Sequence, residues 1–197
     1  MNIGTTLVAA LLAPAPAASP PVETALASAA RYCETVVTEK NVAPPLPAGA
    51  TVEPEGGVPD LVKRFAATQS MVSMFGVGAF AHFRARNGQV WVIRSPQPAV
   101  CHIMVTAVPG GSAALGASFT KSLAGQGWQT VSSIPASAAM PLWRHKVAKW
   151  VSKPNSPNFG LLLDVQGLLP PSSTEDGVQM ELSFIGGNNL QVGSSRR

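Results

Sequence analysis

Two β-prone runs, 79–86 and 89–94, flank the dipeptide Asn87-Gly88 and constrain the fold more than any other feature of the chain. Asn-Gly between such runs is the signature of a type I′ hairpin, because both central residues of that turn need positive φ. A two-residue loop pairs Arg84 with Trp91, where the guanidinium can contact the indole face. It also places four apolar residues on the core side: Phe83, Ala85, Val90 and Val92.

The remaining elements follow from apolar periodicity and turn residues. Apolar residues at helical spacing predict three helices, over 22–37, 59–67 and 112–124. Short β-prone runs predict five further strands, over 100–108, 128–133, 142–152, 159–165 and 178–185. The Pro- and Gly-rich segment 42–58 is expected to be a loop, and no internal repeat is visible. Hairpin-linked strands with few helices predict a single α+β domain over 22–186, an antiparallel sheet with two or three helices packed on one face.

The N-terminus has the pattern of an export signal. Residues 3–12 are an apolar run, and small residues with Pro follow in 13–18, typical of a secretory signal peptide over 1–17. The run is too short to span a membrane, so the mature chain is expected to be soluble. Residues 18–21 then form a linker and 187–197 a disordered tail. The first two residues carry no Lys or Arg, which leaves an Ala/Pro-rich tail on a cytosolic protein as the alternative.

The two cysteines, Cys33 and Cys101, predict one disulfide in an oxidising compartment. Cys33 falls on the apolar face of the first predicted helix, so the bond would tie that helix to the sheet. The alternative is a pair of buried free thiols, which pack as small apolar side chains. Together with the signal, this pairing predicts a periplasmic or secreted protein.

Composition limits the partners of the chain. Hydrophobic residues make up 46% of the 197 residues and charged residues 12%, a balance that favours a packed core over general disorder. The net charge of +4 is modest for this length. A dedicated nucleic-acid binder clusters Lys and Arg more densely on one element, so no nucleic-acid partner is expected. The partner, in the cell envelope or outside the cell, is not identified by the sequence.

The segment 143–153 concentrates cationic and aromatic side chains. Five of its residues are candidates for binding an anion or a partner: Trp143, Arg144, Lys146, Lys149 and Trp150. On a strand, Arg144, Lys146 and Trp150 share one face, whereas a helix would resemble an interfacial membrane helix. We favour the strand, because Trp and Val are β-prone. The plainer interpretation is that the Trp side chains pack in the core and the Lys side chains keep an edge strand soluble.

No motif for catalysis, a metal or a cofactor is present. The polar residues considered for such a site are His82, His102, His145 and Asp164, and none forms the short-range pair of a zinc site. Ser112 follows two glycines and is interpreted as a helix N-cap. We therefore expect a non-catalytic binding or interaction domain without a cofactor. The alternatives are an envelope enzyme whose site, such as His82, His102 and Asp164, is assembled only in the fold, and a binder of an anionic surface through 143–153.

Overall fold

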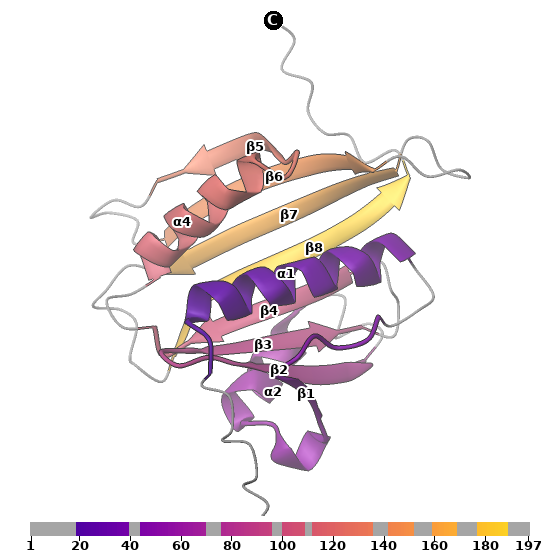
Figure 1. Cartoon of the computed structure of the whole chain (residues 1–197), viewed down its shortest axis with the longest axis vertical. Coiled ribbons are helices and arrows are strands. Elements are labelled where there is room, and N and C mark those ends of the chain that lie inside the picture. The colour runs from indigo at the N-terminus through magenta and orange to yellow at the C-terminus, as the bar shows by residue number, and fades with distance from the viewer. Residues whose placement is uncertain are drawn as a thin grey trace, which may run out of the picture.

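The computed structural model describes residues 19–39, 44–69, 76–95, 100–108, 112–135, 142–151, 159–168 and 177–188. In these ranges, three α-helices accompany one antiparallel sheet of eight strands, which confirms the predicted α+β class (Figure 1). The helices are α1 (Val22–Glu39), α2 (Asp60–Thr68) and α4 (Ser112–Ala124), with a 3-10 turn η1 (Glu55–Gly57). The strands are β1 (Ala50–Glu53), β2 (Ala79–Arg84), β3 (Gln89–Arg94), β4 (Val100–Thr106), β5 (Gln129–Ile134), β6 (Leu142–Val151), β7 (Phe159–Leu168) and β8 (Val178–Asn188). None of the described helices is long and apolar enough to cross a membrane.

The sheet is built from two halves, in each of which a helix precedes four antiparallel strands. Helix α1 precedes β1 to β4, with η1 and α2 between β1 and β2, and α4 precedes β5 to β8. The strand order β1-β2-β3-β4-β8-β7-β6-β5 joins the halves through the antiparallel pair β4–β8 and leaves β1 and β5 at the edges. Apart from η1 and α2, the described parts of the two halves share one order of elements, although no repeat is visible in the sequence.

Helices α1 and α4 cover the same face of the sheet (Figure 1). Their apolar residues pack with the inward-facing residues of the central strands, among them Ile103, Leu163, Leu182 and Phe184, which are 0–1% exposed. Helix α2 packs on the opposite face, where Phe65 joins a second cluster with residues of β2, β3 and β4. Two helices thus share one face, as expected, and the third covers the other side of the first half.

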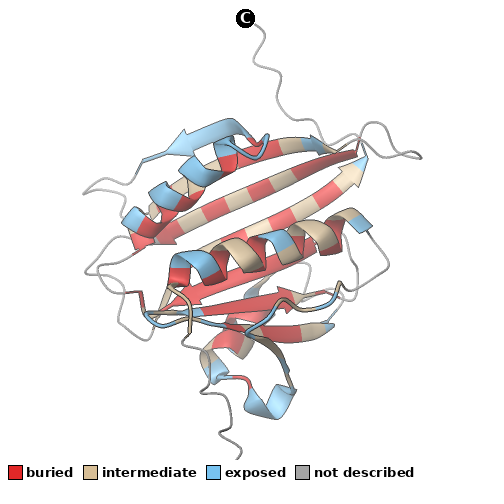
Figure 2. Cartoon of the chain, in the orientation of Figure 1, coloured by how far each residue is buried: buried red, intermediate tan, exposed pale blue. Residues whose placement is uncertain are grey.

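The burial of successive residues along each strand shows which half of the sheet is partly exposed on the α2 side. Strand β4 is buried at every position, because α1 lies over one of its faces and the α2 cluster over the other. Strands β7 and β8 instead alternate between buried and intermediate residues over most of their length (Figure 2). Their buried residues face α1 and α4. The second half of the sheet therefore presents partly exposed side chains on the α2 side.

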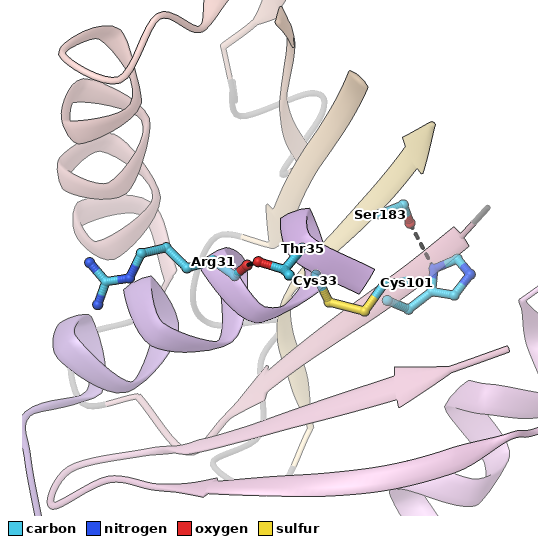
Figure 3. Close-up of a disulfide and its surroundings, with 6 residues drawn as sticks. Arg31, Cys33, Thr35, Cys101 and Ser183 are labelled. Atoms are coloured by element: carbon cyan, nitrogen blue, oxygen red, sulfur yellow. Dashed lines mark hydrogen bonds between the residues drawn. A yellow bond between two sulfur atoms is a disulfide. The ribbon is translucent and has the colours of Figure 1, made fainter. Parts of the chain in front are cut away.

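A disulfide between Cys33 and Cys101 joins α1 to β4 and confirms the predicted pairing (Figure 3). The two Cα atoms are 5.4 Å apart, and both residues are fully buried. The bond connects residues that are 68 positions apart in sequence. It fastens the first helix to the centre of the sheet, and it is compatible with an oxidising compartment.

The hairpin between β2 and β3 differs from the two-residue turn that Asn87-Gly88 predicts. Arg84 lies opposite Gln89 and His82 opposite Trp91, so the loop contains four residues. The predicted Arg84–Trp91 pair is wrong. Instead, His82 stacks on Trp91 with ring centroids 4.4 Å apart.

The longer loop holds the start of α1. The side-chain oxygen of Asn87 accepts a hydrogen bond from the Val22 backbone N–H at 3.4 Å, and the Arg86 N–H donates to the Pro20 carbonyl at 2.8 Å. A Cβ on Gly88 would lie 2.9 Å from Val22 Cγ2, so this close approach requires glycine. The register differs from the predicted one by two residues, which preserves the face of every side chain. Phe83, Val90 and Val92 are buried as predicted, whereas Ala85 lies in the loop and packs, partly buried, against the same cluster.

Other differences concern the ends of elements. Strand β1 occupies part of the segment 42–58, which the sequence predicts to be a loop, and it pairs with β2. Strand β8 continues to Asn188, two residues beyond the predicted domain end at 186. The predicted signal peptide, 1–17, and the tail from 189 onward lie outside the described residues.

Candidate functional site

The basic segment is a strand, as predicted, and its side chains divide between the two faces of the sheet. Arg144 and Lys146 lie on the α2 side together with Trp150, which is 51% exposed. Trp143 and Lys149 lie on the side of α1 and α4. The five candidate residues therefore do not form one continuous surface.

Asp164 of β7 gathers the two cations of the α2 side. Arg144 donates two hydrogen bonds to its carboxylate, with Nε 2.7 Å from Oδ1. Lys146 Nζ lies 3.8 Å from Oδ2 of the same carboxylate. The Asp164 side chain is 17% exposed, and the bidentate pairing is the strong form of a guanidinium–carboxylate contact. These pairings reduce the positive charge that segment 143–153 presents to an anionic polymer.

His102 of β4 belongs to the same row of the sheet. Its Nδ1 lies 2.9 Å from Ser183 Oγ on β8, and Ser183 lies opposite Asp164 on β7. Burial lowers the pKa of His102 to about 4, so the ring is neutral near pH 7. The row therefore places Ser183 between His102 and Asp164.

The residues considered for an assembled catalytic site are not gathered in a cleft. His82 lies on β2, two strands away from His102, and stacks on Trp91. Burial also lowers the pKa of His82. His145 lies on the other face, where its Nδ1 is 2.9 Å from Ser133 Oγ. The structure therefore does not bring His82 and His145 together with His102 and Asp164. Among the described residues, no group of three or more His, Cys, Asp or Glu is placed to hold a metal ion.

Trp143 is part of the core. Its indole occupies the space that a Cβ on Gly116 of α4 or on Gly167 of β7 would need, so two glycines make room for the ring. Its Nε1–H donates to the hydroxyl of Ser112 at 3.3 Å. Ser112, the predicted N-cap residue, is the first residue of α4. Its buried hydroxyl accepts the hydrogen bond from Trp143.

Lys149 is paired on the helix-covered face. Its Nζ lies 2.7 Å from Glu34 Oε1 on α1 and 5.8 Å from the centre of the Trp128 ring. The ammonium therefore links β6 to α1 and contacts an aromatic face. This environment is sufficient to explain a Lys at this position without a ligand.

A pocket of about 230 Å³ opens on the α2 side, at the end of the sheet where β6 and β8 begin. Its described lining comes from α2 and three strands: Phe65, Leu142, Gln166, Gly167, Val178, Gln179, Met180 and Glu181. Most of these residues are apolar, and the polar groups are concentrated on β7 and β8. A mostly apolar pocket with a few convergent polar groups is the usual form of a binding site. We therefore take it as the candidate site and call it the α2 pocket.

Glu181 is the charged residue among the described lining of the α2 pocket. Its pKa is raised above the usual range, chiefly because burial disfavours the carboxylate and because Asp164 adds a like charge. Arg144 and a hydrogen bond from Gln69 act in the opposite direction. A carboxyl group with a shifted pKa in a concave site is a marker of function.

Sequence reasoning does not find the α2 pocket. Phe65, Leu142 and Glu181 lie far apart along the chain, and each fits an ordinary helix or strand pattern. The one available signal is the weak alternation in 178–185, which places Glu181 on the face away from the core.

Comparisons with known proteins assign no function to this site. No family model, no curated protein and no solved structure matches this chain.

Proposed function

We propose that this chain is an exported, periplasmic or secreted, domain that binds a partner or ligand without catalysis, using the α2 pocket. The observation that carries the proposal is the pocket itself, an apolar hollow at the margin of a partly exposed sheet face. Its volume of about 230 Å³ accommodates one ring or a short branched chain, since a cavity of about 150 Å³ is known to hold benzene.

The surroundings of the α2 pocket suit a contact with a larger molecule. Residues of intermediate burial continue from the pocket along β7 and β8, including Asp164, Gln166 and Ser183. Binding surfaces typically combine an anchoring group in a pocket with polar contacts around it. A partner that inserts one apolar group and meets this polar row would follow that pattern.

The export part of the proposal rests on the N-terminal pattern and on the disulfide. Structural disulfides persist mainly in oxidising compartments. Intact mass measurement of the mature protein, with and without reductant, tests this part. We expect a chain that begins at Ala18 and gains two hydrogen masses on reduction. An unprocessed chain with reduced Cys33 and Cys101 would contradict it.

The binding part is tested by closing the pocket. We expect 2-phenylethanol, a neutral apolar probe, to shift the methyl resonances of Leu142 and Val178, the partly buried aliphatic residues of the lining, in the wild-type protein. Val178→Phe fills the pocket from its rim and should abolish the shift at Leu142. Val131→Phe is the matched control, because Val131 lies on β5 outside the pocket and is 38% exposed. Unchanged binding in Val178→Phe, or loss in Val131→Phe, would refute the assignment of the site.

A further inference from the structure

We infer that the α2 pocket selects an apolar group that carries a positive charge, with Glu181 as its counter-ion. The inference rests on the proposed function, since it names the chemical class of the group that enters the same pocket. Such a group is an alkyl or aryl ammonium, whether it belongs to a small amine or to a side chain of a partner protein.

The first argument is the position of Glu181. Its side chain belongs to the described lining of the pocket, beside Val178 and Met180 at the start of β8. Across the sheet, Glu181 lies opposite Gln166 on β7, and Gln166 lies opposite Arg144 on β6. An ammonium in the pocket would therefore meet a carboxylate, an amide and an apolar wall at once.

The second argument is the distribution of charge around the pocket. The Arg144 guanidinium is held by two hydrogen bonds to Asp164, and the Lys146 ammonium also faces Asp164. Both cations thus make their direct contacts with Asp164. Arg144 also favours the charged form of Glu181 from a distance, and the hydrogen bond to Glu181 comes from the neutral side chain of Gln69. Neighbouring groups therefore balance only part of the negative charge of the half-buried Glu181 carboxylate. A cationic ligand would balance the rest of this charge, whereas an anionic ligand would be repelled by it.

The third argument is the aromatic wall. Phe65 of α2 lines the pocket and is 8% exposed, so its ring is held in place by the second core cluster. A cation near an aromatic face gains a favourable electrostatic contact, which is stronger when water is excluded. The aryl or alkyl part of the same group would pack against Phe65 and Leu142.

The experiment compares three probes of similar size: phenethylammonium, 2-phenylethanol and phenylacetate. Affinities are measured on the full mature domain from the methyl shifts of Leu142 and Val178. We expect phenethylammonium to bind about tenfold more tightly than 2-phenylethanol, because a hydrogen bond to a charged group is stronger than one between neutral groups. Phenylacetate should bind most weakly.

Glu181→Gln provides the matched variant, because it removes the charge and retains the size and the hydrogen-bonding capacity. It should bring the amine to the affinity of the alcohol and leave the alcohol unchanged. Glu23→Gln makes the same chemical change at an exposed position in the first turn of α1 and should preserve the preference.

The outcomes separate this inference from the proposed function. Equal affinity of amine and alcohol in the wild type, or a preference that survives Glu181→Gln, overturns the inference and leaves the pocket as a binding site. Failure of all three probes to shift the pocket methyl groups overturns both. Because the probe series alone decides the wild-type preference, the result does not depend on the folding of a variant.

Discussion

Removal of the Cys33–Cys101 bond should lower the free energy of unfolding by about 4 kcal/mol. The bond closes a loop between residues 68 positions apart, and in the chain-entropy model such a loop restricts the unfolded chain by roughly this amount. For a domain of this size, about 4 kcal/mol corresponds to a decrease of roughly 10 °C in Tm. Because folded domains have only about 5–15 kcal/mol of stability, the loss is a large part of the total.

Two perturbations separate the contribution of the cross-link to stability from that of the two buried sulfur atoms. Reduction of the wild-type protein breaks the bond and retains both side chains, which are 0% exposed. Cys33→Ala/Cys101→Ala removes the bond and also deletes two buried sulfur atoms, so it should be somewhat less stable than the reduced wild type. Reduction should be performed in denaturant, because the buried bond is inaccessible in the folded chain.

Guanidinium unfolding followed by tryptophan fluorescence measures the effect. The transition midpoint should fall for both perturbed forms, and the denaturant dependence should rise, because a chain without the cross-link exposes more surface on unfolding. The double variant with reductant is the control, and reductant should leave its curve unchanged. Equal stability of oxidised and reduced wild type would refute the conclusion that this bond constrains the unfolded chain.

Three further predictions concern individual contacts. Gly116→Ala should destabilise the domain by about 1–3 kcal/mol in thermal unfolding, because the added Cβ would collide with the Trp143 ring. The loss is expected although Ala is a better helix former than Gly. A neutral or stabilising result would show that the ring moves aside. His102 has a pKa of about 4 in the folded chain, below its unfolded value of about 6.5, so the unfolded state binds more protons between these values. Stability should therefore fall as pH decreases from about 6.5 to about 4, by up to about 3 kcal/mol, and His102→Gln should remove this part of the pH dependence; an unchanged pH profile would exclude the ring as its source. Asp164→Asn leaves Arg144 without its carboxylate partner. A double-mutant cycle that combines it with Arg144→Met should give a coupling energy of about 1 kcal/mol for the pair. A coupling energy of zero would contradict a stabilising ion pair.

The pattern of the sequence is sufficient for most of the elements and for their apolar faces, although it misses strand β1. Helix α4 begins and ends where the apolar spacing and the flanking glycines predict, at Ser112 and Ala124. The alternation in 142–151 by itself separates Arg144 and Lys146 from Trp143. Side-chain direction in a strand has a period of two residues, so this division depends on local geometry alone.

The same local pattern is insufficient where distant segments meet. Asn87-Gly88 is a strong signal for a tight turn, yet a bond from Val22 to Asn87, 65 residues away, accompanies a wider loop and a different register. The sequence also does not identify the face of β6 that the helices cover. Alternation of side chains along a strand separates two faces, but it does not show which of them packs against the core. The sequence therefore leaves Trp143 either as a binding candidate or as a core residue, and the fold places it in the core.

The sequence by itself predicted most of the elements, their apolar faces and the partners of the disulfide. The tertiary structure alone decided the strand order, the second packing layer under α2 and the α2 pocket. The physical reason is the range of the interactions: hydrophobic periodicity and turn geometry act over a few residues, and they can be read along the chain. A pocket whose lining extends from Phe65 to Glu181 exists only after the two halves of the sheet have paired.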